Sequence, residues 1–94
     1  MSYFSAYDVL VNNINWTKKS LKQLRKVHNS DAKAIVSGVG QLVSFPKAKN
    51  VKKLTKHQYP YRLRVGDYRV FFEFDGEVKI VTIEEVKKRD ERTY

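Results

Sequence analysis

The chain has 94 residues, of which 19 are Lys or Arg and 10 are Asp or Glu, so its formal net charge is +9. It contains no cysteine, which excludes disulfide bonds and thiolate metal sites. The length predicts a single domain over residues 1–94, and the charge favours a polyanionic partner such as nucleic acid or a ribosome. Because the opening residues contain neither a basic segment nor a long apolar run, we expect no signal peptide and no membrane partner, and the lack of cysteine suits a reducing cytosol.

The first two expected elements are a strand and a helix. The strand is predicted near Val9–Trp16, and Thr17 is a suitable N-cap for a helix over residues 18–29. Apolar spacing places three side chains on the buried side of this helix: Leu21, Leu24 and Val27.

A second helix is predicted over residues 31–43, after a stop at Asn29 and Ser30. Its apolar residues recur at three- and four-residue spacing: Ala32, Ile35, Val36, Val39 and Val43. Gly38 and Gly40 each weaken a helix by about 1 kcal/mol relative to alanine, so we expect close packing at these two positions.

Residues 44–57 are expected to form a basic linker with a short turn near Val51–Leu54, because Pro46 ends the second helix. No acidic residue occurs between Asp31 and Asp67. The basic residues in that interval are Lys33, Lys47, Lys49, Lys52, Lys53, Lys56, Arg62 and Arg64. A solvated loop is one interpretation, but the run leads into a strand that carries more arginine, which favours RNA contacts from Lys52, Lys53 and Lys56.

The second half of the chain predicts an antiparallel meander. Its strands are expected at 61–65, 68–74 and 77–83, with two-residue turns at Gly66-Asp67 and Asp75-Gly76. The polar tail that follows is expected to form a helical turn or to fray. The predicted fold class is therefore α+β: an N-terminal strand and a two-helix hairpin packed on an antiparallel sheet of about four strands, with a short C-terminal helical turn.

The two turns predict which residues lie opposite each other. The first places Arg64 opposite Arg69 and Arg62 opposite Phe71. The second places Arg69 opposite Thr82 and Phe71 opposite Ile80. Alternation then gives a core face that consists of Leu63, Val65, Tyr68, Val70, Phe72, Phe74, Val81 and Ile83. The opposite face carries Arg62, Arg64 and Arg69, and we call it the arginine face.

The arginine face is a candidate anion site. Like charges that lie opposite each other destabilise a sheet, whereas a phosphate can accept paired guanidinium bonds from two arginines at once. The alternative is that Glu73, Glu84 or Glu85 pairs with these arginines in ordinary surface ion pairs. Phe71 lies among the arginines and is a candidate base-stacking residue, while Tyr59 and Tyr61 are expected to be rim packing.

The segments Lys53-Leu54, Tyr61–Val70 and Arg89–Tyr94 resemble the RelE branch of the RelE/ParE toxin superfamily, and the resemblance extends over essentially the whole chain. It implies the toxin of a type II toxin–antitoxin system, with an antitoxin, the ribosome and mRNA as partners. It also implies an endoribonuclease that works in the ribosomal A site by attack of a 2′-hydroxyl on the adjacent phosphate, with no metal and no cofactor.

The resemblance also implies roles for single residues. Arg62 and Arg64 fall where RelE toxins have lysines, and Arg69 matches the arginine that holds the scissile phosphate. Lys88 or Arg89 matches the tail arginine near the leaving oxygen. A further match is Tyr94, which would stack on the substrate base.

One departure from the RelE pattern keeps other functions open. An arginine at position 62 cannot act as the general base that a lysine can provide, so His57 or a glutamate would have to take the proton, or catalysis would be purely electrostatic. The alternatives are a ParE-like inhibitor of DNA gyrase and a non-catalytic module that binds RNA or the ribosome.

Overall fold

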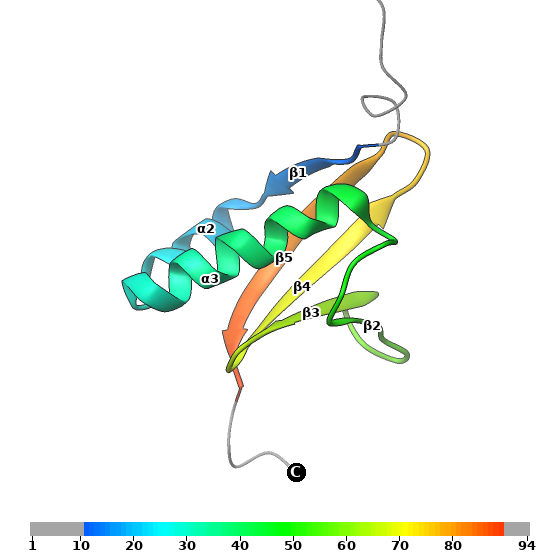
Figure 1. The fold of residues 1–94 in the computed structure, drawn as a ribbon. Helices are drawn as coiled ribbons and strands as arrows, with labels where there is room; N and C mark the ends of the chain where they lie inside the picture. Colours follow the sequence, from blue (N-terminus) through cyan, green and yellow to red (C-terminus); the bar gives the residue numbers. More distant parts are fainter. Residues whose placement is uncertain (1–10, 90–94) are drawn as a thin grey trace, which may run out of the picture.

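The structure, a computed structural model, describes residues 11–89. In chain order its elements are β1 (Asn13–Trp16), α2 (Lys18–Arg25), α3 (Asn29–Gly40), the 3₁₀ helix η1 (Gln41–Ser44), β2 (Val51–Lys53), β3 (Tyr61–Val65), β4 (Tyr68–Asp75) and β5 (Ile80–Lys88). The sheet has the strand order β1-β5-β4-β3-β2. Figure 1 shows α3 crossing the face of the sheet with α2 beside it. The α+β class is confirmed. No helix within residues 11–89 is long and apolar enough to cross a bilayer.

Helix α2 begins where the sequence predicts. Thr17 is its N-cap, and the Thr17 side chain accepts the backbone N–H of Ser20. The prediction for Leu21 is wrong, because this side chain is exposed, whereas Leu24 and Val27 pack against the core. The fully buried residue of this helix is Ser20, whose hydroxyl donates to the Thr17 carbonyl oxygen.

Helix α3 covers the centre of the sheet. Ile35 and Val39 are buried in the core, but Val36 faces solvent. Gly38 lies against β3, and a Cβ at this position would be 2.8 Å from Cγ2 of Val65, so the expected close packing is confirmed there. It is wrong for Gly40, which has no atom within 4 Å of its Cβ position.

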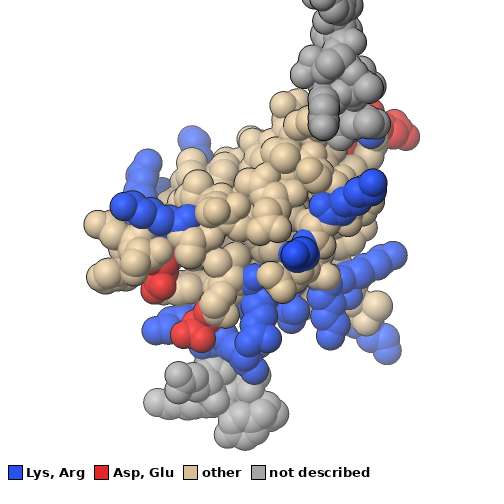
Figure 2. Space-filling view, in the orientation of Figure 1, with Lys and Arg blue, Asp and Glu red and all other residues tan. Residues whose placement is uncertain are grey.

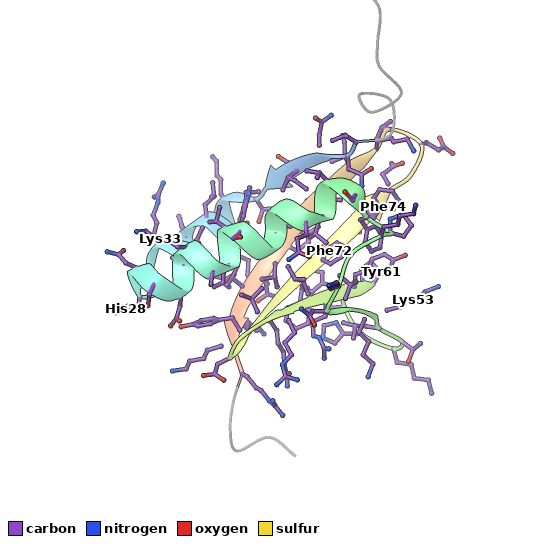
Figure 3. The ribbon with its side chains drawn as sticks, in the orientation of Figure 1. His28, Lys33, Lys53, Tyr61, Phe72 and Phe74 are labelled. Atoms are coloured by element: carbon purple, nitrogen blue, oxygen red, sulfur yellow. The ribbon has the colours of Figure 1, made fainter. Side chains whose placement is uncertain are left out.

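An aromatic group fills the space between the segment after α3 and the sheet. The ring of Phe45 meets the rings of Tyr61, Phe72 and Phe74 edge-on, with centroid distances of 4.9, 5.3 and 5.0 Å. Figure 3 shows these three labelled side chains gathered on this side of the sheet. The side chain of Tyr61 therefore belongs to the core face, on the opposite side of the sheet from the arginines.

The sheet has one more strand than the sequence suggests. Residues 51–53, expected to be a turn in a linker, form β2 and pair antiparallel with β3. At the other edge, β1 pairs parallel with β5, so the sheet is mixed. The short β2 strand has no alternating apolar pattern, so the sequence does not reveal it. Only its pairing with β3 defines it as a strand.

The two predicted hairpin registers have different outcomes. The first is confirmed: Arg64 pairs with Arg69 and Arg62 pairs with Phe71. The second is wrong, because residues 76–79 form a four-residue loop in which Lys79 adopts a positive φ of 58°. Glu73 consequently pairs with Thr82. The predicted faces of residues 72–83 survive this error, because ahead of the bulge the shift is an even number of residues, as when the partner of Glu73 moves from Val78 to Thr82.

Strand β5 continues well beyond its predicted end. It runs to Lys88 along the first half of β4, so the expected helical turn is absent from residues 84–88. A bulge interrupts the pairing: Phe72 pairs with Ile83, but Phe71 pairs with Glu85, which leaves Glu84 as the extra residue. The bulge turns Val86 into the core and Glu85 and Lys87 onto the arginine face.

Candidate functional site

Four arginines line one hollow of about 80 Å³ at the end of the sheet where the β3–β4 turn meets the end of β5. They are Arg62 and Arg64 from β3, Arg69 from β4, and Arg89 directly after β5, and we call this hollow the arginine pocket. The backbone N–H of Arg89 donates to the carbonyl oxygen of Asp67 at 2.6 Å, which fixes the end of β5 against the turn. The strand pairing and this hydrogen bond therefore bring distant parts of the sequence to one site.

Arg62 is one of two half-buried arginines of the pocket, with Arg69. Its Nε atom is buried and has no hydrogen-bond partner among the described residues. Burial lowers the pKa of the Arg62 guanidinium, and the charges of Arg69, Arg64 and Arg89 lower it further. A buried polar group without a partner is costly, and so is a group of mutually repelling cations. An anion in the pocket would reduce the repulsion among these cations.

The glutamates do not neutralise the arginine pocket. Within residues 11–89, the ion pairs join Glu85 Oε1 to Lys19 Nζ at 3.5 Å and to Lys87 Nζ at 3.6 Å. Glu85 is buried, and although desolvation opposes ionisation, hydrogen bonds from Tyr59 and Gln23 and the two lysines lower its pKa. The alternative that glutamates form the arginines' partners is therefore wrong for the described residues.

A pair of carboxyl groups, Glu73 and Glu84, lies at the bulge. A hydrogen bond with Glu73, followed by desolvation and the charge of Glu73, raises the pKa of Glu84 to about 7. The burial of Tyr59, its hydrogen bond to Glu85 and the nearby carboxylates raise the pKa of its hydroxyl to about 12. The arginine face thus has a basic end, at the arginine pocket, and an acidic end, at the bulge.

Phe71 is not available as a base-stacking residue. It is buried on the arginine face, with the ring of His57 stacked over it at 5.0 Å and the ring of Tyr59 tilted against it at 5.8 Å. The prediction of Phe71 as an RNA contact is therefore wrong, because the loop between β2 and β3 folds back over the sheet. Tyr59, expected at the rim, is likewise buried.

The three lysines predicted to contact RNA do not lie on one face of the sheet. Lys52 pairs with Arg62 and so lies on the arginine face, whereas the side chain of Lys53 alternates to the other face beside Tyr61. Lys56 lies in the following loop with a positive φ of 53°. Figure 2 shows Lys and Arg side chains gathered along the side of the molecule where Figure 1 places β2 and β3.

The structure separates the two candidates in the tail. Arg89 lines the arginine pocket, while Lys88 pairs with Tyr68 and lies outside the pocket lining. Tyr94 lies outside the described residues. Lys87 was missed, because only the bulge reveals that it shares a face with Arg69. Within residues 11–89, no three His, Asp or Glu side chains are grouped as metal ligands.

The fold defined by these elements is that of RelE toxins. It matches the toxin–antitoxin complex RelBE2 from Mycobacterium tuberculosis with a TM-score of 0.72 and 24% identity, over 84% of this chain and 99% of that one. It matches the RelE–RelB complex from Pyrococcus horikoshii with a TM-score of 0.74 and 23% identity, over 86% and 98%. The isolated E. coli RelE toxin matches with a TM-score of 0.71 and 17% identity, over 84% and 85%.

The sequence identifies the family. Residues 14–93 match the family described as the ParE toxin of the type II toxin–antitoxin system parDE, and the chain belongs to this family. It is thus a type II toxin of the RelE/ParE superfamily. No curated protein matches the sequence at a significant level.

Proposed function

We propose that this toxin is an endoribonuclease that cleaves mRNA in the ribosomal A site without a metal ion. The observation that carries the proposal is the arginine pocket, in which four cations converge without a carboxylate partner among the described residues. Guanidinium groups bind phosphate oxygens through paired N–H bonds. One RNA phosphate in the pocket would relieve the repulsion among the four side chains.

In the proposed reaction, a 2′-hydroxyl attacks the adjacent phosphorus and the bond from phosphorus to the 5′-oxygen breaks. The products are a 2′,3′-cyclic phosphate and a 5′-hydroxyl. We assign the non-bridging oxygens of the scissile phosphate to Arg69, with Arg62 and Arg64 beside it, and the leaving 5′-oxygen to Arg89. These groups stabilise the negative charge that develops at phosphorus and at the leaving oxygen. We also assign a base-stacking role to Tyr94.

None of the four arginines of the arginine pocket can act as a general base for the 2′-hydroxyl proton. Arginine does not release its proton at neutral pH and therefore cannot accept one from the 2′-hydroxyl. In the proposal this proton passes to hydroxide or water, and the protein contributes position and charge. The expected enzyme is slower than one with a general base, because such a base contributes about 10²- to 10⁴-fold.

The experiment adds the purified protein to a stalled translation complex and to the same mRNA without ribosomes, and maps RNA ends by primer extension. We expect cleavage within the A-site codon that requires ribosomes and falls at least about 10²-fold in Arg69→Ala. Arg25→Ala, which removes an exposed arginine from α2, is the matched control and should cleave normally. Intact mRNA with the unmodified protein would refute the nuclease.

The family match supports a second candidate function. The family is described as ParE of parDE, and a ParE-like toxin would act on DNA gyrase. DNA breaks that depend on gyrase, without loss of mRNA, would favour this candidate, and the arginine pocket would then bind a phosphate of DNA. Tight ribosome binding without cleavage of mRNA would instead indicate a non-catalytic module.

An antitoxin is the expected partner in either case. The M. tuberculosis and P. horikoshii structures are toxin–antitoxin complexes, which supports this expectation. An acidic or amphipathic segment of the antitoxin would neutralise the arginine face and block the pocket. We expect mRNA cleavage to stop at an equimolar amount of the antitoxin.

A further inference from the structure

A stack of three aromatic rings stands on the arginine face immediately beside the arginine pocket. Phe71 is the buried base of the stack, and the ring of His57 lies nearly parallel to it, with a centroid distance of 5.0 Å and an interplanar angle of 15°. Tyr59 leans against both rings. His57 is exposed even though one side of its ring is covered, so the open side faces solvent.

The ring of His57 is held in one orientation. Its Nδ1 accepts the backbone N–H of Tyr59 at 3.0 Å, within the loop that connects β2 to β3. Together with the contact to Phe71, this hydrogen bond fixes both the position and the plane of an exposed ring. An aromatic surface that is already ordered loses little conformational freedom when a flat ligand stacks on it.

The surroundings of this ring indicate what would bind there. Phe71 pairs with Arg62, and Arg62 pairs with Lys52, so the base of the stack and two cations form one row across β4, β3 and β2. On its other side Phe71 pairs with Glu85, whose carboxylate is held by Lys19 and Lys87. Paired residues on one face are about 5 Å apart. Arg62 also lines the arginine pocket. The base of the stack under His57 therefore lies about one strand spacing from Arg62, which lines the place proposed for a phosphate.

We infer that His57 is a stacking platform for a nucleobase of single-stranded RNA, next to the phosphate held in the arginine pocket. The inference rests on the proposed function and adds a base subsite to it. Aromatic side chains, histidine included, stack on unpaired bases in RNA recognition. Lys52 would contact the phosphate on the far side of that nucleotide. The role first expected for Phe71 thus passes to the ring that covers it.

Three substitutions separate the properties of His57. In His57→Asn the amide oxygen can still accept the Tyr59 N–H, but the ring is lost. In His57→Leu an apolar side chain still covers Phe71, but it has no aromatic face. In His57→Tyr the aromatic face is kept. His28→Asn is the matched control, because His28 lies at the opposite end of the molecule from β2, at the N-terminus of α3, where asparagine also caps a helix (Figure 3).

The probe is a short single-stranded RNA that carries 2-aminopurine, whose emission is quenched by stacking, with a 2′-O-methyl group at each sugar to prevent cleavage. A second RNA carries an abasic sugar at the same position. Affinity is measured by fluorescence anisotropy with an end label, and thermal unfolding is recorded for each variant. We expect quenching by the unmodified protein, His28→Asn and His57→Tyr, and none by His57→Asn or His57→Leu.

The affinities distinguish the stacking platform from the arginine pocket. His57→Asn and His57→Leu should bind the base-carrying RNA about 5- to 100-fold more weakly than the unmodified protein does, and all variants should bind the abasic RNA alike. Quenching and affinity that survive in His57→Asn and His57→Leu would overturn the stacking platform and leave the arginine pocket intact. If the unmodified protein binds neither RNA, the stacking platform is overturned, whereas the proposed function, which requires ribosomes, is decided separately by mRNA cleavage on the stalled translation complex.

Discussion

Lys87 of β5 lies directly beside Arg69 of β4 on the arginine face, and one extra residue in β5 puts it there. Without Glu84 in the bulge, strict alternation from Ile83 would turn Lys87 to the core face. The side chain of Gln23 accepts the backbone N–H of Val86 at 2.7 Å, so α2 satisfies a backbone donor just after the bulge. The row Arg64, Arg69, Lys87 consequently spans three strands with positive charge.

This row leads to the first prediction, on RNA binding. Lys87→Ala should weaken binding of single-stranded RNA at every sequence and reduce the slope of log affinity against log salt by about 1, because one phosphate contact is lost. Lys33→Ala removes the same charge from an exposed position of α3, which covers the opposite face of the sheet, and is the control. Titrations at several salt concentrations measure both slopes, and equal slopes for the two variants would show that Lys87 contacts no phosphate.

The second prediction separates two neighbouring residues of the tail. Arg89→Ala should lower the rate of mRNA cleavage by about 10²-fold or more, because Arg89 lines the arginine pocket and is assigned to the leaving oxygen. Lys88→Ala should change that rate less than about threefold, because Lys88 lies outside the pocket lining. Single-turnover cleavage on stalled ribosomes provides the comparison. The reverse order of the two rates would assign the tail role to Lys88.

The third prediction concerns the pH dependence of cleavage. Because no arginine can accept the 2′-hydroxyl proton, the single-turnover rate should rise about tenfold per pH unit between about pH 6 and 9. A plateau near neutral pH would reveal a general base that titrates there. The measurement requires a saturating protein concentration at each pH, so that changes in binding do not enter the rate.

The fourth prediction concerns stability and the carboxyl pair at the bulge. The pKa of Glu84 in the folded protein is raised to about 7, above its ordinary value of 4.5, so the folded state holds a proton that the unfolded state has released. This contribution to stability is complete below about pH 4.5 and is lost as pH rises through about 7. Between pH 5.5 and pH 8, the Tm of Glu73→Gln should fall by roughly 4 °C less than the Tm of the unmodified protein falls.

Thermal unfolding of both proteins at matched ionic strength tests the fourth prediction. Glu77→Gln, which changes an exposed carboxylate in the loop before β5, serves as the control for the loss of one charge. Parallel Tm curves for Glu73→Gln and the unmodified protein would refute the shared proton.

The fifth prediction compares the two glycines of α3. Gly40→Ala should raise the free energy of unfolding by up to about 1 kcal/mol, because alanine favours the helix and its Cβ meets no atom within 4 Å. Gly38→Ala should lower it by about 1–2 kcal/mol, because its Cβ would lie 2.8 Å from Cγ2 of Val65. Urea unfolding measures both changes. Adding Val65→Ala should partly restore Gly38→Ala, and no restoration would place the strain elsewhere.

Local chemistry of the sequence determined several features of this protein. Thr17 caps α2 because its hydroxyl can accept a free N–H, and Gly66-Asp67 sets the register that puts Arg64 opposite Arg69. Alternation along β3 and β4 was enough to predict which side chains lie on the core face and which on the arginine face. These features depend on residues close together in the chain, and such interactions can be read from spacing.

The tertiary structure decided the rest, because it depends on pairing between distant segments. β2 exists only through β3, the bulge at Glu84 is visible only in the pairing of β5 with β4, and His57 covers Phe71 only because a loop folds back. The sequence alone therefore indicated a positively charged sheet face that would bind phosphate. Which cations meet in one pocket, and which aromatic ring remains open beside them, is set by long-range strand pairing and by the path of one loop.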